Sequence, residues 1–275
     1  MMNTLNKQRA LITGATSGIG AEYARQLAAD GWDLIITGRR EEKIQALASE
    51  ISQTTGRDVK VVLVELSDPA QLDDLINRIK DQDLQMLVNN AGFGTTKFFH
   101  REPFEIYEQM IATHIVAHTK IIYAILPGMI ERGVGTIINV SSSGAFLPSP
   151  KTVTYSGTKA YLVAFTESLH MELEGTGVQV QVVCPGLTRT DMHTRLGIPE
   201  EATADWGPFK WISTQEVVAC SLNCLKKNRV LCLPGSLNRT QVLMRRLIPE
   251  AQFYKTMSRY FRKYGWTDGK QSFRR

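Results

Sequence analysis

Short apolar runs alternate with longer amphipathic stretches along most of the chain. Short runs rich in Val, Ile and Leu are typical of strands buried on both faces of a parallel sheet, whereas apolar residues three and four apart are typical of helices. The alternation predicts a Rossmann-like, doubly wound α/β fold with a seven-stranded parallel sheet, which binds ligands at the carboxyl ends of its strands. Strands are expected at residues 9–13, 32–37, 59–64, 84–88, 135–140, 178–183 and 229–233, and the longest helix at residues 103–131.

The first expected strand leads directly into a glycine-rich turn and then a helix. Gly14, Gly18 and Gly20 stand in the spacing G-x-x-x-G-x-G. Glycines let the backbone approach a ligand closely, and a helix N-terminus offers N–H groups and a positive dipole end to phosphates. At the head of a repeating β-α pattern, this turn predicts a dinucleotide-binding site.

The end of the second expected strand bears on which dinucleotide binds. The sequence there is Thr37-Gly38-Arg39-Arg40, with no carboxylate before Glu41. A carboxylate would bind the adenosine ribose 2′-OH, whereas Arg39 offers a planar fork suited to a 2′-phosphate. The sequence therefore favours NADP(H) over NAD(H). The alternative, that Arg39 is only a solvated charge at the start of the next helix, is disfavoured because cations destabilise helix N-termini.

A tyrosine and a lysine stand four residues apart in a helix expected from about residue 155 to residue 174. Tyr155 and Lys159 would then share one helix face. A nearby ammonium makes a phenol easier to ionise, so Tyr155 could exchange protons near neutral pH. Ser142, at the end of the preceding strand, could hold a carbonyl oxygen against that phenol. Tyr-x-x-x-Lys also occurs on solvated helix faces, so the pair gains its meaning from the motifs around it.

Together these motifs resemble the short-chain dehydrogenase/reductase family over about residues 5–235. The sequence around them is most similar to a branch of broad-specificity bacterial reductases, which also resembles ketoacyl and steroid reductases. The matching motifs, in the order and spacing of the family, are Thr13-Gly14-x-x-x-Gly18-x-Gly20, Asn89-Asn90-Ala91-Gly92, Asn139-Val-Ser-Ser142, Tyr155-x-x-x-Lys159 and Cys184-Pro185-Gly186-Leu-Thr188-Arg-Thr190.

The resemblance implies a role for each matching residue. Tyr155 would be the proton donor to a substrate carbonyl, Ser142 would position that carbonyl, and Lys159 would lower the pKa of Tyr155 and bind the nicotinamide ribose. The implied cofactor-binding residues are Gly14, Ser17, Gly18, Ile19, Gly20, Arg39, Glu65, Leu66, Asn90, Ala91, Gly92, Tyr155, Lys159, Pro185, Gly186, Thr188 and Thr190.

Three positions depart from the family pattern. His114 stands where the family usually has an asparagine that helps to relay protons from the lysine through water. The histidine is harmless if the relay uses the helix backbone, it could carry protons itself, or it could simply fill the same space. Glu65 replaces a more usual Asp, and Ala145 replaces a more usual Gly.

Aromatic residues near the expected site suggest an apolar substrate. The resemblance places a substrate lid at residues 191–212, which include Trp206. Phe93, Phe146 and Trp206 are the candidate substrate-binding aromatics, although the same residues could belong to the core.

Composition sets the protein class. The chain has 275 residues, of which 43% are hydrophobic and 21% charged, as in a soluble single domain with a sizeable core. No apolar run reaches the length of about 18 residues needed to span a membrane, and the first residues lack the apolar core of a secretory signal, so a cytoplasmic location is expected. Cys184, Cys220, Cys224 and Cys232 form no CxxC pair and have no His at metal spacing, so no metal site is expected.

The last part of the chain is strongly basic. The domain is expected at residues 1–238 and a basic, amphipathic extension at residues 239–275, which hold ten Lys and Arg and two Asp and Glu. A helix is expected after Pro249. Packing on its own domain or on a second subunit is the preferred reading, a weak contact with a membrane surface is the alternative, and no nucleic-acid binding is expected.

The leading hypothesis is an NADPH-dependent reductase of an apolar ketone, aldehyde or acyl substrate. The alternatives are the same chemistry run as an NAD(P)+-dependent alcohol or hydroxysteroid-type dehydrogenase, or a non-catalytic NADPH-binding regulator. The resemblance implies a homodimer or homotetramer.

Overall fold

A computed structural model describes residues 8–191 and 210–263 of the chain. The seven-stranded sheet predicted from the sequence is confirmed: all strand pairs are parallel, in the order β3-β2-β1-β4-β5-β6-β7. The strands are β1 (Arg9–Ile12), β2 (Asp33–Gly38), β3 (Val59–Leu63), β4 (Met86–Asn89), β5 (Gly135–Val140), β6 (Val178–Val183) and β7 (Leu231–Cys232).

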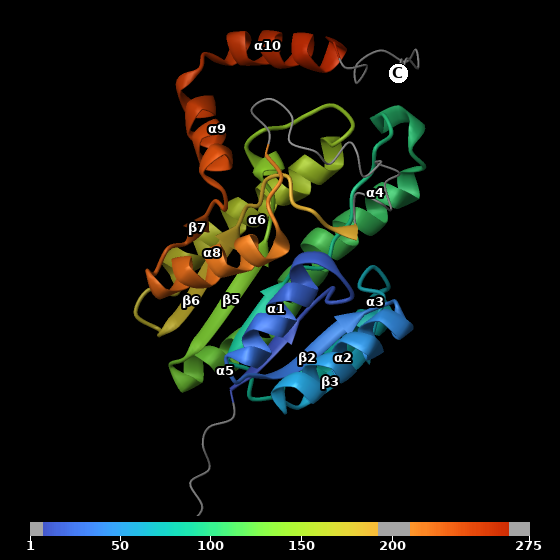
Figure 1. The fold of residues 1–275 in the computed structure, drawn as a ribbon, viewed down its shortest axis with the longest axis vertical. Helices are drawn as coiled ribbons and strands as arrows, with labels where there is room; N and C mark the ends of the chain where they lie inside the picture. The colour runs from blue at the N-terminus through green and yellow to red at the C-terminus, as the bar shows by residue number, and fades with distance from the viewer. Residues whose placement is uncertain (1–7, 192–209, 264–275) are drawn as a thin grey trace, which may run out of the picture.

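Helices cover both faces of this sheet (Figure 1). Successive strand residues point to opposite faces, so Ala10 and Ile12 of β1 pack into one apolar cluster and Leu11 into the other. Helices α1 (Gly18–Ala29), α2 (Glu41–Thr55) and α8 (Thr214–Lys226) contribute to the first cluster, and α3 (Pro69–Ile79), α5 (His118–Arg132) and α6 (Val153–Glu172) to the second.

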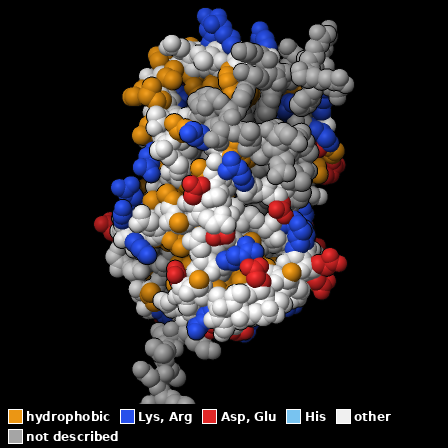
Figure 2. Space-filling model, viewed as in Figure 1, with side chains coloured by type: hydrophobic (Ala, Val, Ile, Leu, Met, Phe, Trp, Pro, Cys, Tyr) orange, Lys and Arg blue, Asp and Glu red, His pale blue; other side chains and the backbone are white. Residues whose placement is uncertain are grey.

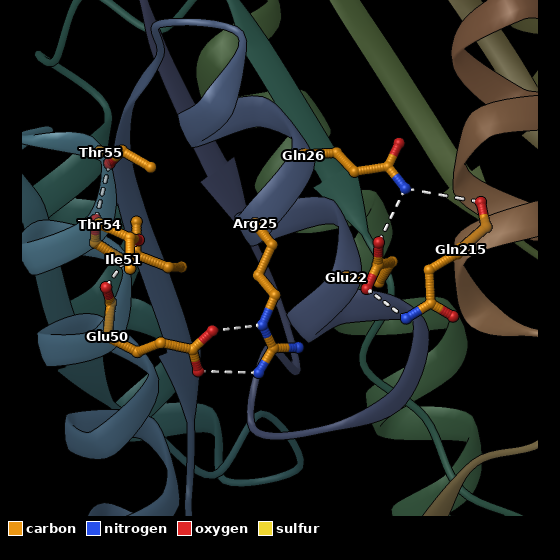
Figure 3. A network of polar contacts seen from close by, with 8 residues as sticks. All are labelled: Glu22, Arg25, Gln26, Glu50, Ile51, Thr54, Thr55 and Gln215. Carbon is orange, nitrogen blue, oxygen red and sulfur yellow. Dashed lines mark hydrogen bonds and ion pairs between the residues drawn. The ribbon is translucent and has the colours of Figure 1, made fainter.

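Polar contacts hold α1 between α2 and α8 (Figure 3). Arg25 of α1 donates two hydrogen bonds to the Glu50 carboxylate of α2, at 2.7 and 2.9 Å. On the other side of α1, Gln215 of α8 donates to Glu22 at 3.2 Å. These contacts fix the helix whose N-terminus follows the glycine-rich turn.

The long central helix differs from the sequence prediction. Instead of one helix over residues 103–131, α4 (Phe104–Ile111) and α5 are joined by a π-helical turn at Ala112–Ala117. The widened turn contains His114, which is fully buried, and such turns are frequent at functional sites. By length and composition alone, the stretch Phe104–Arg132 is apolar enough to span a membrane, and 44% of its most apolar window is buried in the protein.

Two helices, α9 (Ser236–Leu247) and α10 (Glu250–Lys263), follow the last strand and lie beyond the carboxyl edge of the sheet (Figure 1). The helix expected after Pro249 is therefore present. Phe253 of α10 is only 6% exposed, and the Arg245 guanidinium of α9 lies 4.1 Å from its ring centre. Hydrophobic side chains also gather on the surface at the α9 end (Figure 2), where Leu243, Met244 and Leu247 are exposed. Membrane contact by this part of the chain stays a prediction.

Most of the expected substrate lid, including Trp206, lies outside the described residues. The two ends of that segment are held together in the structure. The backbone N–H of Arg189 donates to the Ile212 carbonyl at 3.0 Å, and the Ile212 N–H donates to Leu187, also at 3.0 Å. The segment therefore begins and ends beside the loop that follows β6.

Candidate functional site

The loops after β1 and β4 are bound to each other at the carboxyl edge of the sheet. The Thr13 hydroxyl oxygen accepts hydrogen bonds from the backbone N–H groups of Asn90 at 3.0 Å and Ala91 at 3.1 Å. The Asn90 side-chain amide in turn donates to the carbonyl oxygens of Thr13 and Gly14. Two motifs that are far apart in the sequence are thus joined by hydrogen bonds, and the loops that carry them, after β1 and β4, form the floor of the candidate site.

Glycines permit this close approach. Gly14 has a φ of +67°, and a Cβ there would lie 2.6 Å from the Ala91 Cα. A Cβ on Gly20 would lie 2.4 Å from the Asn90 amide nitrogen. The protein's own packing therefore excludes a side chain at either position.

The N-terminus of α1 is open to an anion. Ser17 occupies the cap position but makes no side-chain cap; its hydroxyl instead accepts a hydrogen bond from Arg40 at 2.6 Å. Arg40 also donates to the Thr16 hydroxyl, at 3.0 Å through Nε. The first N–H groups of α1 consequently have no partner from the cap side chain, which is the arrangement that binds phosphates. Gly18 and Ile19 lie in this first turn.

The second strand ends at an exposed ion pair. Arg39 donates to Glu65 at 2.7 Å, and the two side chains are 59% and 34% exposed. Glu65 and the buried Leu66 follow β3, so both lie at the carboxyl edge, where the sequence had placed the adenosine end of the cofactor.

The loop after β6 lies beside the loops after β5 and β1. The Ser143 N–H donates to the Pro185 carbonyl at 2.8 Å, and the Thr188 hydroxyl donates to the Gly186 carbonyl at 3.1 Å. A Cβ built on Gly18 would lie 3.2 Å from the Thr190 methyl group. The predicted cofactor residues after β6 therefore lie next to the glycine-rich turn.

The three residues predicted to be catalytic are brought together. Ser142 follows β5 and accepts a hydrogen bond from the Gly144 N–H at 3.1 Å, which leaves its own hydroxyl proton free to donate. The Ser142 hydroxyl lies close enough to Tyr155 of α6 to lower the pKa of its phenol. The Lys159 Nζ lies 5.7 Å from the Tyr155 ring centre and donates to the Val140 carbonyl at 2.9 Å. The lysine is thus anchored to the end of β5.

The proton affinities of Tyr155 and Lys159 are set mainly by burial. Burial raises the pKa of Tyr155, which the nearby Ser142 hydroxyl partly offsets, and burial lowers the pKa of Lys159 to about 8. Burial is therefore the largest influence on the pKa of Tyr155, and the lowering of that pKa by Lys159 stays a prediction.

His114 connects the floor of the site to the catalytic helix. Its Nε2 accepts a hydrogen bond from the Phe93 N–H at 3.0 Å, so the ring proton must reside on Nδ1. Nδ1 lies 2.9 Å from the Thr158 hydroxyl, which itself donates to the Tyr155 carbonyl at 2.8 Å. A Cβ on Gly92 would lie 2.9 Å from Nε2, so glycine is needed beneath the ring.

The same surroundings keep this imidazole neutral. Burial, the Lys159 charge and the neighbouring His118 together hold the pKa of His114 well below its usual value. Burial and Lys159 also lower the pKa of His118 to about 3. Both nitrogens of His114 are engaged in its neutral form, which favours a fixed bridge over a proton carrier.

Of the candidate substrate residues, Phe93 and Phe146 lie at the site. The Phe93 ring packs edge-on against His114, with 5.7 Å between ring centres. Phe146 packs against a small apolar cluster that includes Val163 and Cys184. Both rings are only partly buried, so each has surface left for a ligand.

The structure adds functional residues that the sequence analysis missed. Thr13 ties two loops together, Arg40 holds the glycine-rich turn, and Thr158 links His114 to Tyr155. Each stands within or beside a recognised motif, but only the three-dimensional contacts reveal its partner.

Comparisons with known proteins agree with this geometry. A family model described as short chain dehydrogenase matches residues 8–201. An uncharacterized oxidoreductase of Staphylococcus saprophyticus is 29% identical over 246 residues, which cover 89% of this chain and 99% of that protein. A very-long-chain 3-oxoacyl-CoA reductase of Anas platyrhynchos is 34% identical over 188 residues, which cover 66% of this chain and 60% of that protein.

Among solved structures, a short-chain dehydrogenase from Sphingobium yanoikuyae in complex with NADPH is similar, with a TM-score of 0.78 and 28% identity. The similarity covers 97% of this chain and 99% of that one. The fold, the site and the family match lead to one conclusion: this chain belongs to the short-chain dehydrogenase family and is an oxidoreductase.

Proposed function

We propose that the protein is an NADPH-dependent reductase that converts the carbonyl of an apolar ketone, aldehyde or acyl substrate to an alcohol, with Tyr155 as the proton donor. The observation that carries this proposal is the grouping of Ser142, Tyr155 and Lys159 at the carboxyl edge of the sheet, beside an uncapped helix N-terminus. The dinucleotide, when bound, supplies the hydride.

The protein's own residues supply orientation and a proton. Tyr155 carries a proton at neutral pH because burial raises its pKa, so it is in the form that an acid requires. The Ser142 hydroxyl, whose oxygen already accepts from Gly144, can donate to the same carbonyl oxygen. Lys159, with a pKa of about 8, is mostly charged at pH 7 and stabilises negative charge as the phenol loses its proton.

The residues at the glycine-rich turn fit a dinucleotide phosphate. The N-terminus of α1 offers N–H groups, and Arg40 lies on the Ser17 hydroxyl beside it. Arg39 is paired with Glu65, but an exposed ion pair contributes only about 0–1 kcal/mol, so a 2′-phosphate can replace the carboxylate as its partner. These cations support NADP(H) as the cofactor, as does the NADPH bound in the Sphingobium yanoikuyae relative.

Steady-state kinetics with both cofactors test this choice. We expect NADPH to be preferred, and we expect Arg39→Ala to lower kcat/KM for NADPH by about tenfold or more while leaving kcat/KM for NADH nearly unchanged. Arg57→Ala is a matched control, because Arg57 donates to the Gly31 carbonyl at the opposite end of β2. A wild-type preference for NADH would contradict the proposed cofactor.

The proposed apolar substrate rests on the partly exposed rings of Phe93 and Phe146. A series of ketones and 3-oxoacyl thioesters of increasing chain length, followed by NADPH absorbance, tests it. We expect kcat/KM to rise with chain length, by up to about fourfold per buried methylene. Equal rates for short polar and long apolar carbonyls would contradict an apolar substrate.

We also propose that the protein self-associates through α4 and α5. Ile111, Val116, Tyr123 and Ile130 along this stretch are 40%, 45%, 83% and 41% exposed, which is unusual for apolar residues on one helical segment. Sedimentation of the wild type and of Tyr123→Glu tests the proposal. A monomeric wild type would contradict it.

A further inference from the structure

Three of the four cysteines meet between α8 and β7, the strand at one edge of the sheet (Figure 1). Cys220 and Cys224 stand four residues apart in α8 and so face the same side of that helix. Cys232 of β7 faces them from the sheet. The three sulfur atoms all lie within 4.8 Å of one another, and the Sγ atoms of Cys220 and Cys232 are 3.7 Å apart.

From this geometry we propose that Cys220, Cys224 and Cys232 form a binding site for a soft, thiophilic metal ion, for which Cu(I) is the best match. Cu(I) is selected by sulfur ligands and accepts three of them, whereas structural Zn(II) sites use four. Within the described residues, the cluster supplies three ligand atoms from His, Cys, Asp or Glu.

The distances suit a metal better than a disulfide. With metal–sulfur bonds of about 2.3 Å, three sulfurs around one ion lie about 4.0 Å apart, close to the spacing already present. A disulfide between Cys220 and Cys232 would require their sulfurs to approach from 3.7 Å to about 2.0 Å. Metal binding therefore needs a smaller movement of the sulfur atoms than a disulfide would need.

The surroundings allow the ion to enter and favour its retention. Cys224 and Cys232 are buried at 8% and 0% exposure, which excludes water, while Cys220 is only partly buried and provides a path from the surface. Burial raises the pKa of the Cys220 and Cys232 thiols, so both are neutral until a metal ion displaces their protons.

The site would stabilise the part of the sheet that borders the active site. Cys232 accepts, through its backbone carbonyl, a hydrogen bond from the Cys184 N–H at 2.8 Å, and Cys184 immediately precedes the loop at Pro185. A metal ion that joins α8 to β7 would therefore restrain the strand next to the predicted cofactor loop.

The test uses the full-length, reduced protein without oxygen. Cu(I) is supplied as its complex with a coloured chelator, and the loss of that colour measures transfer to the protein. We expect one Cu(I) per chain, and at least a tenfold lower affinity for Cys224→Ser and Cys232→Ser. Cys184→Ser is the matched control, since its buried thiol lies outside the cluster, and it should bind like the wild type.

A second measurement needs no variant and so does not depend on their folding. In the wild type, alkylation of the partly exposed Cys220 should slow at least tenfold after one equivalent of Cu(I), as read by peptide mass spectrometry. Uptake of Zn(II) with the same dependence on the three cysteines would support a soft-metal site and would replace Cu(I) as its ion. No uptake of either ion, uptake unchanged in Cys232→Ser, or unprotected Cys220 at full Cu(I) loading would overturn the proposal.

Discussion

His114 offers the sharpest test of how the active site is held together. Its ring accepts from the Phe93 N–H and donates to the Thr158 hydroxyl, and Thr158 in turn contacts the backbone of Tyr155. We predict that His114 positions Tyr155 through these contacts and does not itself carry protons. Two substitutions, His114→Leu and His114→Gln, separate the two roles.

The expected magnitude follows from the contacts. His114→Leu leaves the Phe93 N–H without its partner, which costs about 1–3 kcal/mol, and removes one hydrogen bond to the Thr158 hydroxyl, which costs about 0.5–1.5 kcal/mol because that hydroxyl keeps its bond to the Tyr155 carbonyl. The free energy of unfolding should therefore fall by about 1.5–4.5 kcal/mol. Gln places an amide oxygen close to the position of Nε2, so His114→Gln should keep the bond from Phe93 and lose about a third as much.

Urea unfolding and steady-state kinetics are measured on the same preparations. A displaced Tyr155 should reduce kcat/KM by up to about 100-fold in His114→Leu, with partial recovery in His114→Gln. Thr158→Val, which removes the other end of the bridge, should lower activity in the same way. Combined with His114→Leu, it should add little further loss, because both changes remove one contact chain.

A proton-carrying histidine would give a different pattern. Neither Leu nor Gln can exchange protons, so both variants would lose turnover equally, and the acidic limb of the pH–rate profile would disappear in both. Equal loss in His114→Gln and His114→Leu, with the stability of His114→Gln unchanged, would refute the positioning role.

Two further predictions concern stability. The folded protein lowers the pKa of His118 to about 3, so the unfolded chain binds more protons than the folded protein between pH 6.5 and 3. The free energy of unfolding should therefore fall by about 1.4 kcal/mol for each pH unit below 6.5 because of this histidine. In urea unfolding measured from pH 7 to 5, the free energy of unfolding should change less with pH in His118→Gln than in the wild type. A series with no slope in the wild type would contradict this. Gly14→Ala should lower the free energy of unfolding by at least about 1–2 kcal/mol, because φ is +67° and the new Cβ would lie 2.6 Å from a backbone atom. Gly157→Ala is the control and should be tolerated, because no atom lies within 4 Å of the new Cβ. Equal melting temperatures of the two variants would contradict the packing argument.

The sheet could be predicted because its strands are short, apolar and separated by helices of regular period. Each expected strand is present, within a few residues of the predicted limits. The interruption of the long helix could not be predicted, because a π-helical turn changes the register by one residue without leaving a distinct signal in the sequence. His114 marks its position, but the same residue would also fit a continuous helix.

The contacts between motifs were less accessible to sequence reasoning. The pattern identified Tyr155 and Lys159 as neighbours, yet the direction of the Tyr155 pKa depends on how far burial outweighs a charge, which requires coordinates. The same holds for the cysteines. Cys220 and Cys232 are twelve residues apart and belong to no recognised motif, and only the packing of α8 on β7 places their sulfurs 3.7 Å apart.

Turnover by Tyr155→Phe is the most direct test of Tyr155 as the proton donor. The change removes one oxygen and keeps the ring, so the packing against His114, at 5.9 Å between ring centres, is retained. On any carbonyl that the wild type reduces, we predict a loss in kcat of at least about 100-fold, while the Kd for NADPH, measured by fluorescence, stays within a few-fold. Turnover within tenfold of the wild type, with NADPH bound equally well, would contradict the assignment of Tyr155.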